Sequence, residues 1–152
     1  MRKNLKAFGI CFGIAVALVA IYVFWSANKT MRNAYATWWA ADMVVAHLQK
    51  NRDQWPKSWS DLRDDYEECV QTSGEPWTFD EIRNRVYIDF SATTDQLKRS
   101  ANASGPEFDV IHAADGSNAH WQSREPNTII FNYLHGVEAP KPIRVGFGGS
   151  GR

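Results

Sequence analysis

The stretch AFGICFGIAVALVAIYVFWSAN, residues 7–28, decides how this chain is organised. It contains 22 residues without a charged side chain. A helix rises about 1.5 Å per residue, so about 20 apolar residues cross a hydrocarbon core of about 30 Å. Tyr22, Phe24 and Trp25 close the run, and aromatic rings favour the lipid–water boundary. The stretch therefore predicts a single transmembrane helix.

Two other interpretations use the same residues. A cleaved signal peptide has a shorter apolar region followed by a small-x-small site. Here the small pair Ala15 and Ala17 lies inside the run, and the bulky Trp25 stands at its end, which favours an uncleaved anchor over cleavage. A lipoprotein signal needs a small residue before its cysteine, whereas Cys11 follows Ile10, so that interpretation fails.

The charges on either side of the run predict its orientation. Arg2, Lys3, Lys6 and the amino terminus come before it, and Lys29 and Arg32 come just after it. Since basic residues accumulate on the cytoplasmic side, we expect the N-terminus in the cytoplasm and the C-terminal part outside, on the periplasmic or extracellular side. The lipid bilayer is thus the first predicted partner.

Length, composition and charge narrow the kinds of protein that this chain can be. A length of 152 residues suits one modest folded domain and excludes a multidomain enzyme. A hydrophobic share of 44% excludes wholesale disorder. From residue 26 on there are 14 basic and 17 acidic side chains, a net charge of −3. No nucleic-acid partner is expected, because phosphate contacts need clustered Lys and Arg.

Three small residues mark one side of the predicted span. Gly9, Gly13 and Ala17 recur at i, i+4 and i+8, the small-xxx-small spacing that lets transmembrane helices approach closely. They predict helix–helix packing in a homo-oligomer or with another membrane protein. The alternative is that Gly and Ala are simply common in such spans.

The helical pattern continues beyond the span. Apolar residues follow a three-and-four spacing at Tyr35, Trp38, Ala41, Val45 and Leu48. The opposite, polar face is expected at Arg32, Asn33, Thr37, His47 and Lys50. No proline occurs before Pro56. We therefore predict one helix over about 6–51, half in lipid and half lying on a domain.

After Pro56 the sequence predicts short elements. Ser58-x-x-Asp61 resembles a capping box that opens a small helix. A turn is expected at 73–76, a strand from 77, strands over 85–90 and 108–112, and a turn at Asp115-Gly116 leading into a strand over 120–122. Residues 127–135 suit a strand or a helix; Glu125-Pro126 before them and Gly136 after them favour the helix.

These elements predict an α+β fold in which a long N-terminal helix packs on a small antiparallel sheet that covers its apolar stripe. The expected organisation is a cytoplasmic stub and transmembrane helix over 1–28, an extracytoplasmic domain over 29–138 and a flexible Pro/Gly-rich tail over 139–152.

This layout resembles the type IV pilin-like proteins, in particular the pseudopilins of type II secretion. The local match is residues 44–62, where a long helix ends in a polar segment followed by Trp55-Pro56-x-Ser58-x-x-Asp61-Leu62. The resemblance implies a pilin-like fold. It does not extend to the family's cleavage site, because the position five residues after Gly9 or Gly13 holds Ile14 or Leu18 in place of the family's Glu.

Possible reactive groups are scattered. Asp109, His112, Asp115 and His120 include metal-ligand types, and Ser117 joins them as a nucleophile type, but four histidines in the whole chain make such proximity expected by chance. Cys11 and Cys69 form no zinc or redox motif. We therefore expect no catalytic residue, no metal site and no cofactor.

Two surface features remain. Acidic residues crowd positions 61–68, which indicates either a solvated helix and loop or a patch for a cation or basic partner. Tryptophans on predicted loops and strand ends could form a partner-binding surface or simply belong to the core: Trp55, Trp59, Trp77 and Trp121.

The leading hypothesis is a membrane-anchored, non-enzymatic interaction or assembly protein. The alternatives are a monomeric, membrane-tethered domain that binds a solute or partner and, third, a metal-dependent hydrolase using His112 and His120.

Overall fold

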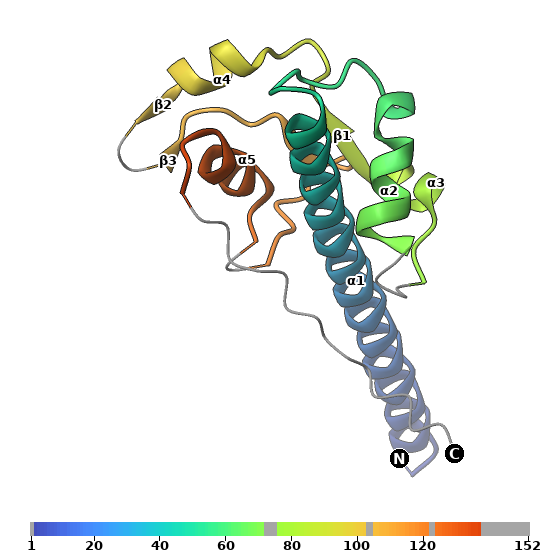
Figure 1. Ribbon diagram of the computed structural model, residues 1–152. Coiled ribbons are helices and arrows are strands. Elements are labelled where there is room, and N and C mark those ends of the chain that lie inside the picture. Colours follow the sequence, from blue (N-terminus) through green and yellow to red (C-terminus); the bar gives the residue numbers. More distant parts are fainter. Residues whose placement is uncertain (1, 72–75, 103–104, 122–123, 138–152) are drawn as a thin grey trace, which may run out of the picture.

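The computed structural model describes residues 2–71, 76–102, 105–121 and 124–137, and their side chains except those of 2–11 and 102. A long helix, α1 (Arg2–Lys50), runs from the N-terminal end into the domain (Figure 1). The other elements follow in the order η1 (Trp59–Leu62), α2 (Arg63–Cys69), α3 (Phe79–Arg85), β1 (Val86–Ile88), α4 (Thr94–Arg99), β2 (Ala101–Asn102), β3 (Gly105–Pro106), β4 (Ile111–Ala113) and α5 (Pro126–Leu134). The mixed α+β class and the single long helix are confirmed.

Two residues just after α1 end the helix, and one of them bonds its end to the rest of the domain. Arg52 and Asp53 take left-handed backbone angles, φ 54° and 61°, which break the helix at a conformational cost for residues with a side chain. Asp53 offsets this cost through tertiary bonds: its carboxylate accepts from Tyr133 Oη at 2.7 Å and from Lys98 Nζ at 3.2 Å. These bonds join the end of α1 to α4 and α5.

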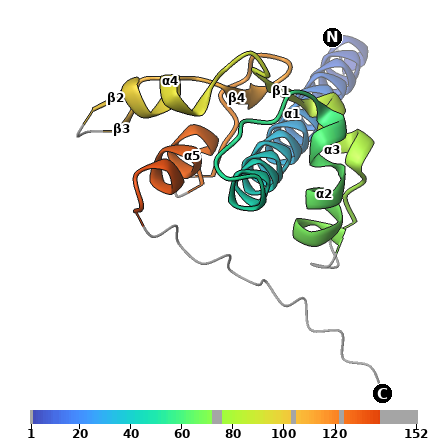
Figure 2. The same ribbon diagram turned by 45° about the horizontal axis from the view of Figure 1, so that its top comes forward.

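The upper half of α1 is the centre of the domain. Helix α5 packs on one side of it and α2 and α3 on the other, and the β1–β4 sheet contacts it as well (Figures 1 and 2). The two strands pair antiparallel, with Val86 opposite Ala113 and Ile88 opposite Ile111. Their inward residues are buried.

The expectation that a sheet covers the apolar stripe is therefore too simple. The β1–β4 sheet has two strands of three residues each and shares the task with α2, α3 and α5. Strands this short bury too little to form the whole partner surface of a helix.

The buried side of α1 is also broader than predicted. Ala41 and Leu48 are buried as expected, but Tyr35, Trp38 and Val45 are only half-buried. Two residues assigned to the polar face, Asn33 and Thr37, are 3% and 1% exposed. Thr37 is satisfied there because its Oγ1 donates to the carbonyl oxygens of Ala34 and Ala119, at 3.1 and 3.2 Å.

Two short helices were missed by sequence reasoning. Thr78 caps α3 in a reciprocal capping box with Glu81, so the predicted strand from residue 77 is wrong. Thr93 and Gln96 make the same arrangement at the start of α4, which was not predicted. Each box satisfies backbone N–H groups that a helix start leaves free, and this local gain outweighs β propensity over such short segments.

The region around Pro56 follows the prediction in part. A short helical segment does begin at Trp59, but Ser58 does not cap it, since its hydroxyl donates to the Asp61 carboxylate at 3.2 Å. The carboxylate also accepts from the Lys57 backbone N–H at 2.8 Å. The segment continues directly into α2.

Of the elements predicted after residue 114, the structure confirms a turn and a helix and contradicts a strand. The helix alternative for 127–135 is confirmed by α5, and Gly116 takes φ 72° in the predicted turn. The strand expected over 120–122 is wrong for the described residues 120 and 121, where Trp121 makes an isolated bridge to Arg124. Residue 122, most of the turn at 73–76 and the tail over 139–152 lie outside the described residues.

Candidate functional site: the collar on α1 and the adjoining pocket

In the described part of the chain, α1 has no covering side chains over Phe12 to Trp25. All large apolar side chains described from Phe12 to Trp25 are exposed, with Trp25 at 62%. By length and composition this part of α1 could cross a membrane, and none of its apolar window is buried within the described residues. A soluble domain rarely leaves so large an apolar surface in water.

The change from bare helix to domain core is abrupt. Met31 is 45% exposed, whereas Asn33 and Ala34 are 3% and 4% exposed. Because α1 continues through this point without a break, no linker separates the apolar half from the domain.

A cluster of polar side chains lies on one face of α1 at this level, because positions 29, 32 and 33 are three and four residues apart. Lys29 Nζ lies 2.7 Å from Asp115 Oδ2, and Arg32 pairs with Glu81. Asn33 joins three elements: its amide donates to Asp115 Oδ2 at 3.1 Å and Ser117 Oγ at 3.2 Å, and its Oδ1 accepts from Arg85 at 3.1 Å. We call this cluster the collar; it consists of Lys29, Arg32, Asn33, Glu81, Arg85, Asp115 and Ser117.

The two acids of the collar are held in their charged form. Hydrogen bonds from Lys29 and Ser117 lower the pKa of Asp115. Hydrogen bonds from Thr78, with the charges of Arg32 and Arg85, lower the pKa of Glu81. At neutral pH the cations Lys29 and Arg32 therefore face carboxylates of the same chain.

Aromatic side chains gather just above the collar. The Tyr35 ring lies 5.2 Å from that of Trp121 and 6.3 Å from that of Trp77, and the Arg32 guanidinium lies 5.2 Å from the Trp77 ring. Trp121 is 38% exposed, whereas Trp77 is buried. Of the four predicted surface tryptophans, Trp77 and Trp121 thus each contact the Tyr35 ring.

The other two lie elsewhere. Trp55 is buried and donates its Nε1–H to the Asp89 carbonyl oxygen at 2.9 Å. Trp59 is half-buried and packs edge-on against Phe79 and Phe90. A partner surface that includes all four indoles stays a prediction. Trp55 and Trp77 would add little area to such a surface, because both are buried.

The predicted packing face of the span is open in one copy of the chain. A Cβ added at Gly13 would meet no atom within 4 Å, and Ala17 is exposed. The side-chain surroundings of residue 9 lie outside the described residues, so Gly9 stays a prediction together with the packing itself.

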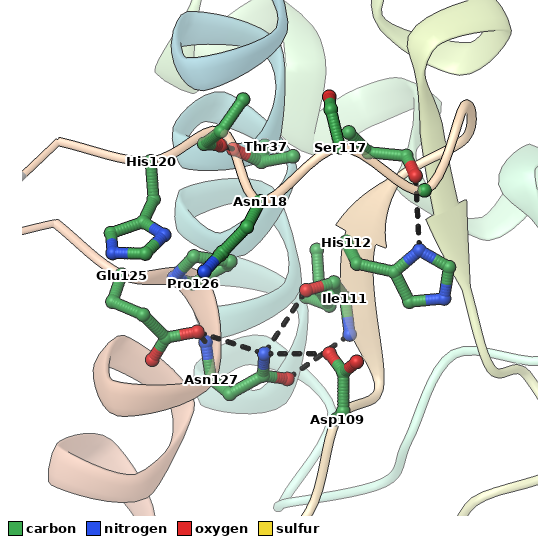
Figure 3. Close-up of a pocket in the computed structure, with 13 residues that line it drawn as sticks. Thr37, Asp109, Ile111, His112, Ser117, Asn118, His120, Glu125, Pro126 and Asn127 are labelled. Atoms are coloured by element: carbon green, nitrogen blue, oxygen red, sulfur yellow. Dashed lines mark hydrogen bonds between the residues drawn. The ribbon is translucent and has the colours of Figure 1, made fainter.

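A pocket of about 400 Å³ opens beside α1 and shares Ser117 with the collar (Figure 3). Its walls come from α1, β4, the turn after β4 and the start of α5, and its polar lining includes Thr37, Asp109, Ser117, Asn118, His120, Glu125 and Asn127. Such a volume suits a small organic molecule.

Asn127 organises one wall of this pocket. It is 5% exposed; its Oδ1 accepts from the backbone N–H groups of Val110 and Ile111, at 2.8 and 3.1 Å. Its amide group donates to Asp109 Oδ1, the Ile111 carbonyl oxygen and Glu125 Oε1 (Figure 3). Sequence reasoning missed this residue, because its partners lie up to 18 positions away along the chain.

Glu125 is occupied as a helix cap. Its carboxylate accepts from the backbone N–H groups of Asn127 and Thr128 at the start of α5. Burial acts to raise the pKa of Glu125, but hydrogen bonds from Thr128 and Asn127 outweigh it and the pKa is lowered. The carboxylate is therefore a poor proton acceptor for chemistry in the pocket.

The four residues considered for a metal serve separate purposes. Asp115 belongs to the collar, Asp109 binds Asn127, and the His112 ring stacks on Tyr87 at 4.8 Å. His120 lines the pocket. Within the described ranges, no group of three His, Cys, Asp or Glu side chains is placed to hold a metal ion. Ser117 donates its hydroxyl proton to Asp115 at 2.6 Å, which leaves its oxygen unactivated by a histidine.

The acidic segment is partly structural. Asp65 is 2% exposed and accepts from Lys50 Nζ at 2.8 Å, with His47 Nδ1 at 3.3 Å. Lys50 also pairs with Glu68 at 2.6 Å. These bonds tie α2 to the end of α1 and place positive charge at the helix C-terminus, where it is favoured.

Asp42 is a half-buried acid on α1 that the sequence pattern did not single out. Burial raises the pKa of this carboxyl to about 6, against the opposing charge of Arg124, whose guanidinium lies 4.6 Å from the Trp38 ring. The folded state thus favours the neutral acid more than the unfolded chain does.

This shift predicts a pH-dependent stability. For an acid whose folded-state pKa is raised, the stabilising contribution is complete below the unfolded pKa near 4 and is lost as the pH rises through about 6. Between these limits, the unfolding free energy of the wild type should fall by about 1–2 kcal/mol relative to Asp42→Asn. Urea unfolding followed by tryptophan fluorescence at several pH values measures the difference. The exposed Asp95→Asn is the control; a constant difference for Asp42→Asn would contradict the expectation.

Comparison with known proteins adds no relative. No family model, curated protein or solved structure matches this chain significantly.

Proposed function

We propose that this protein is a single-span, membrane-anchored, non-enzymatic protein with a pilin-like domain on the outer side of the membrane, used for interaction or assembly. The observation that carries the proposal is the division of α1. One half exposes apolar side chains from Phe12 to Trp25, and the other half forms the core of the domain. A helix of this kind anchors a domain and fixes its orientation at the same time.

The anchoring part of the proposal has a direct test. Protein extracted from its native membranes should have the mass of the full chain and resist alkaline extraction. Protease added from the outer side should cleave the domain. Loss of the apolar run from the mature protein would replace the proposal with a secreted domain, and a domain protected from protease would reverse the orientation.

Assembly is proposed to use the face of Gly9, Gly13 and Ala17. The open surroundings of Gly13 support it, because a second helix could approach there without a clash. Crosslinking in membranes should yield oligomers that weaken severalfold in Gly13→Leu, since the added side chain separates the helices. Ala15→Leu is the matched control, because position 15 lies on the opposite side of the helix. Equal loss in both variants, or none in either, would remove the assembly role from this face.

A monomeric, membrane-tethered binding domain is the second candidate. The pocket of about 400 Å³ beside α1 favours it. Crosslinking that yields only monomer, together with a small polar ligand that raises the melting temperature, would support this candidate over assembly.

A further inference from the structure

We propose that the base of the domain is seated on the lipid headgroups of the bilayer that its own anchor crosses, with the collar in the headgroup layer and Trp121 at its outer edge. This inference rests on the proposed membrane anchoring. It adds a second interaction surface, separate from the apolar half of α1, whose partner is the polar part of the membrane.

The first argument is distance along α1. Lys29 is the first charged residue after the apolar stretch, so the hydrocarbon boundary falls near it. Headgroups add about 5–8 Å on each side of the hydrocarbon core. Arg32 and Asn33 follow Lys29 by three and four positions, a rise of about 5–6 Å in a helix. Their partners Glu81 and Asp115 are held at the same level by direct bonds.

The second argument is that no flexible segment separates the apolar half of α1 from the domain. The helix is continuous, and its surroundings change from exposed to buried between Met31 and Asn33. The domain wraps α1 immediately above the bare half of the helix (Figure 1). To lift away from the membrane, the domain would have to unwind α1 and open the collar. Tilting of the helix, by about 20° in typical spans, moves one edge of the domain closer still.

The third argument is the chemistry of this surface. Two exposed indoles, Trp25 and Trp121, stand below and above the collar, and Lys29 Nζ lies 6.0 Å from the Trp25 ring. Tryptophan favours the membrane–water interface because its ring is apolar and its N–H is polar. The aromatic contact of Trp121 with Tyr35 places it about six residues, or roughly 9 Å, above Lys29.

The charges of the collar indicate which headgroups it suits. Lys29 and Arg32 are paired with Asp115 and Glu81. The third cation of the collar, Arg85, donates to Asn33 and acts on the charge of Glu81, so the collar carries one net positive charge and attracts anionic lipid only weakly. A polybasic lipid-binding surface would instead present several unpaired cations. We therefore assign a zwitterionic headgroup layer as the sufficient partner, contacted through polar side chains and the indole ring.

The full chain in phosphatidylcholine vesicles allows a direct test. In a Cys11→Ala, Cys69→Ala background, single cysteines replace the exposed Asp80 in α3 or the exposed Asn118 after the collar turn, and each carries a fluorophore. Gln49→Cys is the distal control, because it lies 20 residues beyond Lys29, about 30 Å higher on α1. Phe24→Cys reports the anchor itself.

A nitroxide on the choline headgroup should quench the fluorophores at positions 80 and 118 at least about twofold more than at position 49, since contact quenching falls steeply over the height of the headgroup layer. Equal, weak quenching at 49, 80 and 118 would overturn the seating. An acyl-chain nitroxide should quench position 24; failure there would overturn the membrane anchoring instead. Added phosphatidylglycerol should leave the pattern unchanged, and a large increase would overturn the assignment to zwitterionic headgroups.

Discussion

Replacing Val16 and Val19 together with arginine should release this protein from membranes. Both residues lie near the middle of the apolar stretch, and both are exposed on the bare half of α1. An arginine at the centre of a transmembrane helix costs about 2.5–3.5 kcal/mol on the insertion scale, so two cost about 5–7 kcal/mol. Within the folded chain no described side chain covers these positions, so the domain has no means of offsetting that cost.

The measurement is alkaline extraction of membranes, followed by detection of the chain in pellet and supernatant. The Val16→Leu, Val19→Leu variant is the control for changed side-chain size and should stay in the pellet. If the double-arginine variant also remained in the pellet, another part of the chain would hold it to the membrane and the assignment of α1 as the anchor would fail.

Asn127→Ala should destabilise the domain by about 3–5 kcal/mol. The change removes five hydrogen bonds from a side chain that is 5% exposed. The N–H groups of Val110 and Ile111 lose their acceptor, and an unsatisfied buried donor costs about 1–3 kcal/mol. The Asp109 and Glu125 carboxylates also lose the donor that lies between them.

Urea unfolding of the full chain in detergent micelles, followed by tryptophan fluorescence, gives the free energy of unfolding. Asn118→Ala is the matched control, because it removes an exposed amide from the same pocket and should change stability by less than about 0.5 kcal/mol. Asn127→Asp keeps the acceptor oxygen but replaces the donor by an acceptor, so it should also destabilise. A loss below about 1 kcal/mol for Asn127→Ala would show that this network does not hold α5 to β4.

The sequence by itself determined the features that depend on local pattern. Uncharged residues over 7–28 predict a helix long enough to cross a membrane. The lack of proline before Pro56 predicts that this helix continues to about residue 51, and α1 ends at Lys50. The turn at Gly116 and the helix over 127–135 were also predictable, because turn glycines and a proline at a helix start act through neighbouring residues.

The tertiary structure decided which residues meet. Asn33 and Thr37 were predicted on the polar face, yet partners from α3 and from residues 115–119 after β4 satisfy them and so permit their burial. The acids and histidines over 109–120 lie close together along the chain, yet the fold gives them separate partners: Asp115 pairs with Lys29, and His112 stacks on Tyr87. A side chain's hydrogen-bond partners across tens of residues are set by packing, and no local pattern encodes them. The collar on α1 is therefore visible only in the folded chain.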